Sequence, residues 1–134
     1  MTVFTLDNPA GIPSSARQAY SNVAVIPLGE RTMLILAGQV AWDDDHQIVG
    51  GDDLRAQTRR VLDLIGAALA AHGAGLADIV NLRVFLTDIS RIREYGDVRA
   101  EYFQGLPAPT SVAVEVSSLF MPEALIEVEA TAII

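Results

Sequence analysis

Short runs of apolar or alternating residues recur along the chain at the length and spacing of strands. A turn at Gly29-Glu30-Arg31 joins the first two runs into a hairpin. The segment 43–53 is expected to be a loop with room for a brief strand at 47–49, and the first 15 or so residues, which hold Pro9 and Pro13, are expected to be irregular. The pattern predicts strands over 20–28, 32–42, 79–87, 111–118 and 125–133.

Two further segments place their apolar residues at helical spacing. Asp52 or Asp53 would cap the first helix, and Gly73 would end it just after His72. The second helix would start at Asp88 or Ser90. Its apolar stripe consists of Ile92, Tyr95, Val98, Tyr102 and Phe103.

The resulting order, β-β-(β)-α-β-α-β-β, predicts a single α+β domain over residues 1–134. Two helices can cover only one face of its mixed sheet. Strand periodicity then assigns one set of apolar side chains to the face beneath the helices. That set is Val80, Leu82, Val84 and Leu86; Val112, Val114 and Val116; and Ile126, Val128, Ala130 and Ala132.

The opposite face of the sheet mixes small, charged and aromatic residues, among them Arg83, Phe85 and Glu127. Such a face could simply meet water, as in many antiparallel sheets. The strand at 32–42 is apolar on both faces, however, and this favours cover by a partner subunit. Small polar groups would then line a cleft between chains.

Composition narrows the range of functions. The 134 residues include no Cys and no Lys, which excludes thiolate chemistry and any lysine Schiff base. A net charge of −8 disfavours nucleic acid as a partner and suits a protein that handles small molecules. The longest stretch free of charged residues, 64–77, is too short to span a membrane, and the N-terminus lacks the features of a signal peptide, so a cytoplasmic location is expected.

Several segments, in this order and at this spacing, carry a family likeness. They are AYSNVAV (19–25), AGQVAWDDDHQIVGGDD (37–53), AQTRRVLDLIGAAL (56–69), DIVNLRVFLTDIS (78–90), EYF (101–103) and LIEVEATA (125–132). The sequence resembles the RidA/YjgF family, also called L-PSP or reactive-intermediate deaminase. The resemblance implies a chorismate-mutase-like fold, a homotrimer with clefts between subunits, and hydrolysis of small enamines or imines without a metal or cofactor.

One element of the family pattern is missing. Deaminase members carry an arginine at the start of the penultimate strand that grips the substrate carboxylate. Depending on register, Ser111 or Pro109 stands there in this chain, so the sequence resembles an arginine-lacking branch. Ala37 replaces a frequent serine, and Gly96 replaces a frequent asparagine.

Two positions of this chain match the family's reactive groups. The resemblance implies that Glu127 positions the attacking water and that Tyr20 contributes a hydroxyl. The competing interpretations are a structural carboxylate and an interface aromatic, and Arg83 is expected to pair with Glu115, Glu127 or Glu129. The substrate-binding candidates are Ala37, Gly38, Phe85, Gly96, Ser111 and Ala113.

The first hypothesis is therefore a RidA-like hydrolase or deaminase that acts on a small reactive metabolite. The alternative is a trimer of the same fold that binds a small metabolite without turning it over. A chorismate-mutase activity is disfavoured, because a dianion needs several cations and the cleft-facing positions supply only Arg83. The acidic run 43–45 with His46 lacks metal-ligand spacing, so no metal site is predicted.

Overall fold

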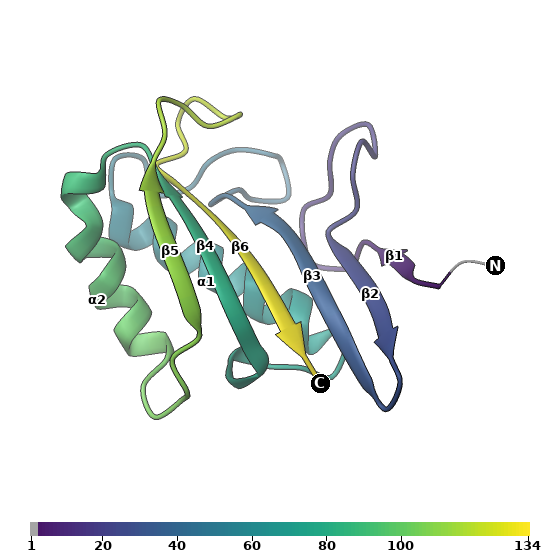
Figure 1. Ribbon diagram of the computed structural model, residues 1–134. Helices are drawn as coiled ribbons and strands as arrows, with labels where there is room; N and C mark the ends of the chain where they lie inside the picture. The colour runs from purple at the N-terminus through teal and green to yellow at the C-terminus, as the bar shows by residue number, and fades with distance from the viewer. Residues whose placement is uncertain (1–2) are drawn as a thin grey trace.

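Six strands form one mixed sheet, and both helices pack on the same side of it (Figure 1). The computed structural model describes residues 3–134. Across the sheet the strand order is β1-β2-β3-β6-β4-β5. The strands are β1 (Thr5–Asp7), β2 (Val23–Leu28), β3 (Arg31–Gln39), β4 (Ile79–Leu86), β5 (Thr110–Glu115) and β6 (Ile126–Ile133), and the helices are α1 (Leu54–Ala70) and α2 (Ile92–Tyr102).

The connections explain this order. Strands β2 and β3 form the predicted hairpin, whose turn contains Gly29 at φ +64°, a conformation that glycine adopts without strain. Strand β6 lies between β3 and β4 and is antiparallel to both, while β5 is parallel to β4. Parallel strands need a long crossover, which α2 provides. The predicted α+β architecture and element order are confirmed.

The N-terminal region differs from the expectation. Residues 5–7, predicted as irregular, form β1 and pair with β2. The contact is reinforced from the turn that follows α1, because His72 Nε2 lies 2.9 Å from Asp7 Oδ2. Conversely, the brief strand expected at 47–49 is reduced to a single bridge between Trp42 and Ile48.

Helix α1 begins and ends where the sequence places it. The Asp53 side chain accepts a hydrogen bond from the Ala56 amide at 3.0 Å and so caps the first turn. Gly73 adopts φ +75°, and the chain then folds back so that the Ala74 amide bonds to the Leu69 carbonyl at 2.9 Å. The apolar stripe of α1 is buried against the sheet, with Val61, Leu62 and Ile65 at most 1 % exposed.

The predicted buried face of β4 is correct except at its start. The register shifts between Ile79 and Asn81, which is a bulge relative to β6. The bulge reverses the local alternation, so Ile79 is buried and Val80 is 43 % exposed. From Leu82 onward the alternation matches the prediction.

The predicted face of β5 is wrong. Val112 and Val114 are 48 % and 39 % exposed, and they lie on the side of the sheet away from the helices. Their neighbours Ser111 and Ala113 pair with Leu82 and Val84 of β4, which are buried beneath the helices. Apolar character alone predicts an inward direction for these valines, but their pairing with Arg83 and Phe85 of β4 points them away from the helices.

The face of the sheet away from the helices therefore carries several uncovered apolar side chains. They come from four strands: Ile35 on β3, Val112 and Val114 on β5, Val80 on β4 and Ile133 on β6, each at least 36 % exposed. In residues 3–134 no helix has the length and apolar character that crossing a bilayer would require.

Candidate active site

Tyr20, Ala37, Gly38 and Glu127 line one cavity of about 270 Å³ together with Phe120. Ala37 and Gly38 lie near the end of β3, and Glu127 lies near the start of β6. Tyr20 comes from the segment that leads into β2. Both residues proposed as catalytic, and two of those proposed as substrate contacts, thus meet in one place.

A bulge in β3 creates the room for the Glu127 side chain. The pairing of β3 with β6 shifts register between Leu36 and Gln39, next to Gly38. A Cβ placed on Gly38 would lie 3.0 Å from Cδ and 3.1 Å from Cγ of Glu127, and closer still to Oε1. Glycine is therefore required here for close approach, and the carboxylate rests against the β3 backbone.

Glu127 is half-buried, and its burial raises the pKa of its carboxyl group, with a further contribution from the charge of Glu129. Burial likewise raises the pKa of the Tyr20 phenol, and the nearby Glu127 charge adds to the effect. The site thus holds a carboxylate that gains a proton more readily than usual beside a phenol that keeps its own.

Arg83 takes the structural role that the sequence favoured. Its guanidinium Nη1 lies 3.6 Å from Glu129 Oε2 and sits 5.9 Å from the centre of the Phe85 ring. Phe85 and Glu127 are paired residues of β4 and β6, so Phe85 flanks the carboxylate on the uncovered face of the sheet. Arg83 therefore pairs with Glu129, which lies two residues after Glu127 along β6 and on the same face of the sheet.

A chain of buried amide side chains fixes the floor of the cavity. Gln39 donates from Nε2 to Asn22 Oδ1 at 3.1 Å and accepts from Trp42 Nε1 at 3.3 Å. Asn22 in turn donates to the Pro13 carbonyl at 2.9 Å. Gln39 and Asn22 are each only 1 % exposed, so their polar groups must find these partners within the protein. These linked amide side chains hold the segment that carries Tyr20 against β3.

No pattern in the sequence points to Phe120, which completes the cavity. It lies in the loop between β5 and β6 and is 59 % exposed, with its ring edge-on to Trp42 at 6.2 Å. The same loop is anchored to α1, because the buried Gln57 donates to the Glu123 carbonyl and accepts from the Leu125 amide. An aromatic residue in a loop otherwise suggests only an exposed side chain.

A neighbouring cavity of about 290 Å³ shares Tyr20 and Phe120 with the first one. Its remaining lining is Ser15, Ala16, Trp42, His46 and Met121. The His46 Nε2 atom lies 2.7 Å from the Ser14 carbonyl oxygen, so the ring is held by the backbone. The two aromatic side chains therefore stand between the cavity that contains Glu127 and a neighbouring cavity that has no carboxylate in its lining.

The remaining substrate-binding candidates lie elsewhere in the chain. Gly96 lines a separate cavity between α2 and β5. Ser111 faces the same side as α2 and accepts a hydrogen bond from Arg99 Nη1 at 3.3 Å, and Ala113 packs against the core. The expectation that Ser111 and Ala113 share a face with Glu127 is thus wrong within one chain, because β5 presents the opposite face.

No group of three or more His, Asp or Glu side chains in residues 3–134 is arranged to hold a metal ion. In the acidic run before His46, the Asp43 carboxylate bonds to backbone amides of its own turn. Asp43 accepts hydrogen bonds from the amides of Asp45 and Gln47, both at 2.9 Å. This arrangement is an ordinary polar loop.

The sequence matches the family described as endoribonuclease L-PSP over residues 12–134. This chain is a member of the RidA/YjgF family. Among similar sequences is a RutC family protein of Pyrococcus horikoshii, which is 41 % identical over 99 residues, 74 % of this chain and 77 % of that protein.

Solved structures of RidA/YjgF relatives share the whole fold. A member of the YjgF/YER057c/UK114 family from Mycobacterium tuberculosis is 37 % identical, with a TM-score of 0.78, and the match covers 98 % of this chain and 99 % of that one. A protein of unknown function from the Rid family of Yersinia pestis is 31 % identical, with a TM-score of 0.85, covering 96 % and 98 %. The family and its fold, expected from the sequence, are confirmed.

Proposed function

We propose that this RidA/YjgF protein hydrolyses a small enamine or imine to the corresponding carbonyl compound and ammonia. The observation that carries the proposal is the meeting of Glu127, Tyr20 and the Gly38 backbone in one cavity of about 270 Å³. The volume is near the lower end of the range for small-molecule sites. A half-buried carboxylate beside a neutral phenol supports proton transfer to and from a small substrate.

The hydrolysis needs one base that later acts as an acid. In our proposal the Glu127 carboxylate accepts a proton from water as the oxygen attacks the iminium carbon, which gives a carbinolamine. The resulting carboxyl group then returns the proton to the nitrogen. The C–N bond breaks as the Glu127 carboxylate takes the hydroxyl proton of the carbinolamine, which leaves a C=O group, and that proton passes to the released ammonia to give ammonium. An enamine first takes a proton on its β-carbon to give the iminium. The raised pKa of Glu127 suits both halves of this cycle.

Tyr20 would act as a hydrogen-bond donor to the substrate or the attacking water. The raised pKa of its phenol keeps the hydroxyl protonated over the neutral pH range, so it can donate throughout the reaction. Ser111 and Pro109 stand at the two positions where the family arginine could lie, so neither position supplies an arginine to the cavity. We therefore expect weak affinity for free amino-acid-derived imines.

We further propose that the chain forms a homotrimer and that a neighbouring subunit closes this cavity. The support is the apolar residues on the helix-free face, which would be unusual for a monomer in water. Light scattering should give three times the chain mass of 14.3 kDa. Introducing a charge with Val112→Arg should lower the assembly state and the hydrolysis rate together, whereas a monomeric parent protein would contradict the proposal.

The direct test of the activity follows loss of enzymatically generated 2-aminoacrylate in the presence and absence of the protein. Glu127→Gln should lower the accelerated rate by at least 100-fold, the usual contribution of a general base being about 10²–10⁴-fold. Glu123→Gln, which removes an exposed carboxylate, is the matched control and should match the parent. The alternative, a protein that binds a small metabolite without turning it over, would instead be favoured by two results together. A substrate analogue would bind tightly, and neither the parent protein nor Glu127→Gln would change the rate at which 2-aminoacrylate is lost.

The family's name refers to an endoribonuclease, but we do not extend that activity to this chain. A net charge of −8 repels the phosphate backbone of RNA and so disfavours it as a substrate.

A further inference from the structure

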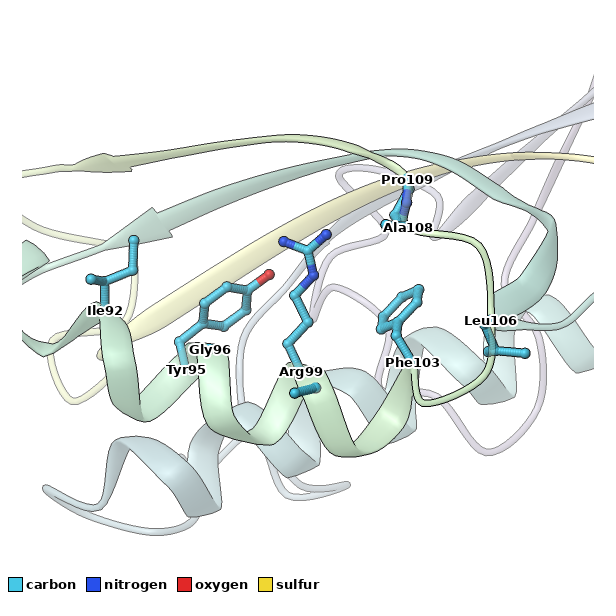
Figure 2. A pocket seen from close by; sticks show the side chains of 9 residues that line it. Ile92, Tyr95, Gly96, Arg99, Phe103, Leu106, Ala108 and Pro109 are labelled. Carbon is cyan, nitrogen blue, oxygen red and sulfur yellow. The ribbon is translucent and has the colours of Figure 1, made fainter.

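The cavity that Gly96 lines, of about 450 Å³, lies between α2 and the chain leading into β5, on the helix side of the sheet. Figure 2 shows its walls, which are mostly apolar. Ile92, Phe103, Leu106 and Pro109 form much of the lining, and Gly96 leaves open space on the α2 side. Tyr95 and Arg99 supply the polar groups in this apolar surround.

Arg99 has the free hydrogen-bonding capacity that an anion would use. Among residues 3–134, no carboxylate lies within ion-pair distance of its guanidinium, whereas Arg55, Arg59 and Arg83 each have one and Arg91 has two. Its contacts are a hydrogen bond to the Ser111 hydroxyl at 3.3 Å and the face of the Phe103 ring at 5.7 Å. A guanidinium carries five N–H donors, so one serine leaves most of them available.

Tyr95 provides a second, independent indication of a ligand. The residue is only 3 % exposed, and the neighbouring Arg99 guanidinium can only donate to its hydroxyl, so within the described part of the chain the O–H proton has no acceptor. In Figure 2 the hydroxyl and the Arg99 guanidinium rise from α2 toward the sheet and end beside each other. Buried polar groups that lack a hydrogen-bond partner are rare in native proteins unless a ligand or water satisfies them.

We propose that this cavity binds a small monocarboxylate that has an apolar body. One carboxylate oxygen accepts from the Arg99 guanidinium and the other accepts from the Tyr95 hydroxyl, while the apolar part lies against Phe103, Ile92 and Leu106. Arg99 and Tyr95 are one turn apart on α2, so a planar two-oxygen group can span both. The inference does not rest on the proposed hydrolysis, because it concerns neither Glu127 nor the cavity that contains it.

Benzoate is a suitable probe, with benzamide as its neutral counterpart. Titration into ¹⁵N-labelled protein should shift the amide signals of α2 and of residues 106–111, and should shift the Arg99 Nε–Hε signal. Benzamide at the same concentrations should bind roughly 10-fold or more weakly, because a hydrogen bond to a charged group is worth about 1.5–3 kcal/mol. Equal binding of benzoate and benzamide would overturn the proposal.

Three variants locate the binding groups. Arg99→Gln should weaken benzoate binding roughly 10- to 100-fold, whereas Arg93→Gln, which removes an exposed arginine from the same helix, should leave it unchanged. Tyr95→Phe should weaken binding by a few-fold and should also raise the unfolding temperature of the free protein, because it removes the unpartnered hydroxyl. Unchanged benzoate affinity in Arg99→Gln, or an absence of shifts in α2, would refute the site without affecting the proposal for Glu127.

Discussion

Gly38 allows a stringent test of the cleft geometry that needs no substrate. Replacing it with alanine places a methyl group against Glu127, at 3.0 Å from Cδ and 3.1 Å from Cγ. Turning the carboxylate alone does not relieve this overlap, because Cγ is also too close. Either the Glu127 side chain changes its first torsion or the paired strands β3 and β6 move apart.

The expected magnitude can be worked out from two opposing effects. Overpacking of this kind typically costs about 1–3 kcal/mol. Alanine also restricts the unfolded chain, which stabilises the folded state by about 0.4–1 kcal/mol where the backbone permits it. Gly38 does not have a positive φ, so the backbone does permit it. Gly38→Ala should therefore destabilise the protein by up to about 2.5 kcal/mol.

The decisive comparison is made in the Glu127→Ala background, where the overlapping atoms are gone. There Gly38→Ala should stabilise the protein by about 0.4–1 kcal/mol, so the effect changes sign between the two backgrounds. Urea unfolding of the parent, both single variants and the double variant, at one protomer concentration, gives a coupling energy of about 1–3 kcal/mol. An equal effect of Gly38→Ala in both backgrounds would show that Glu127 does not rest against β3, and the proposed site would lose its floor.

Three further outcomes follow from the same contacts. Burial raises the pKa of Glu127, so the folded protein holds the carboxyl proton more tightly than the unfolded chain, and the resulting stability is present at low pH and lost as the pH rises through the raised pKa. Glu127→Gln should therefore be more stable than the parent at pH 7 and should lose that advantage near pH 4. Thermal unfolding at both pH values tests this. Gln57→Leu should lower the free energy of unfolding in urea by about 1–3 kcal/mol, because the loop carbonyl and amide that now bond to Gln57 would lose their partners. A neutral result would mean that α1 does not hold the loop that carries Phe120. Arg91→Met should destabilise the protein more than Arg83→Met in chemical denaturation. Arg91 is mostly buried and bonds Glu94 at 2.7 Å, whereas the exposed Arg83–Glu129 pair at 3.6 Å should contribute less than about 1 kcal/mol. The reverse order of the two variants would contradict this reasoning.

Local signals in the sequence were enough to predict most of the fold. The cap at Asp53 and the glycine at 73 delimit α1, and both act through contacts within a few residues. The failures involve contacts between distant strands. The bulge that exposes Val80 arises from pairing with β6, and the outward direction of Val112 follows from its pairing with Arg83 of β4. Alternation alone cannot distinguish a face covered by helices from a face covered by another chain.

The candidate site was predicted unevenly for a similar reason. Tyr20 and Glu127 were assigned mainly through the family resemblance, and they do lie together. The requirement for glycine at position 38 is a matter of space between two strands far apart in sequence, which no local pattern reports. Phe120 stands in a long loop, and only the anchoring of that loop to α1 places its ring beside Trp42.

The cavity at Glu127 is built from parts of unequal rigidity. Its floor belongs to paired strands backed by the amide chain of Gln39, whereas Tyr20 and Phe120 come from connecting segments. Loops accept insertions and exchanges far more readily than paired strands do. Divergence among relatives, and laboratory evolution alike, can thus reshape which molecules enter by altering residues 15–20 and 117–122, while the Glu127 carboxylate keeps its position.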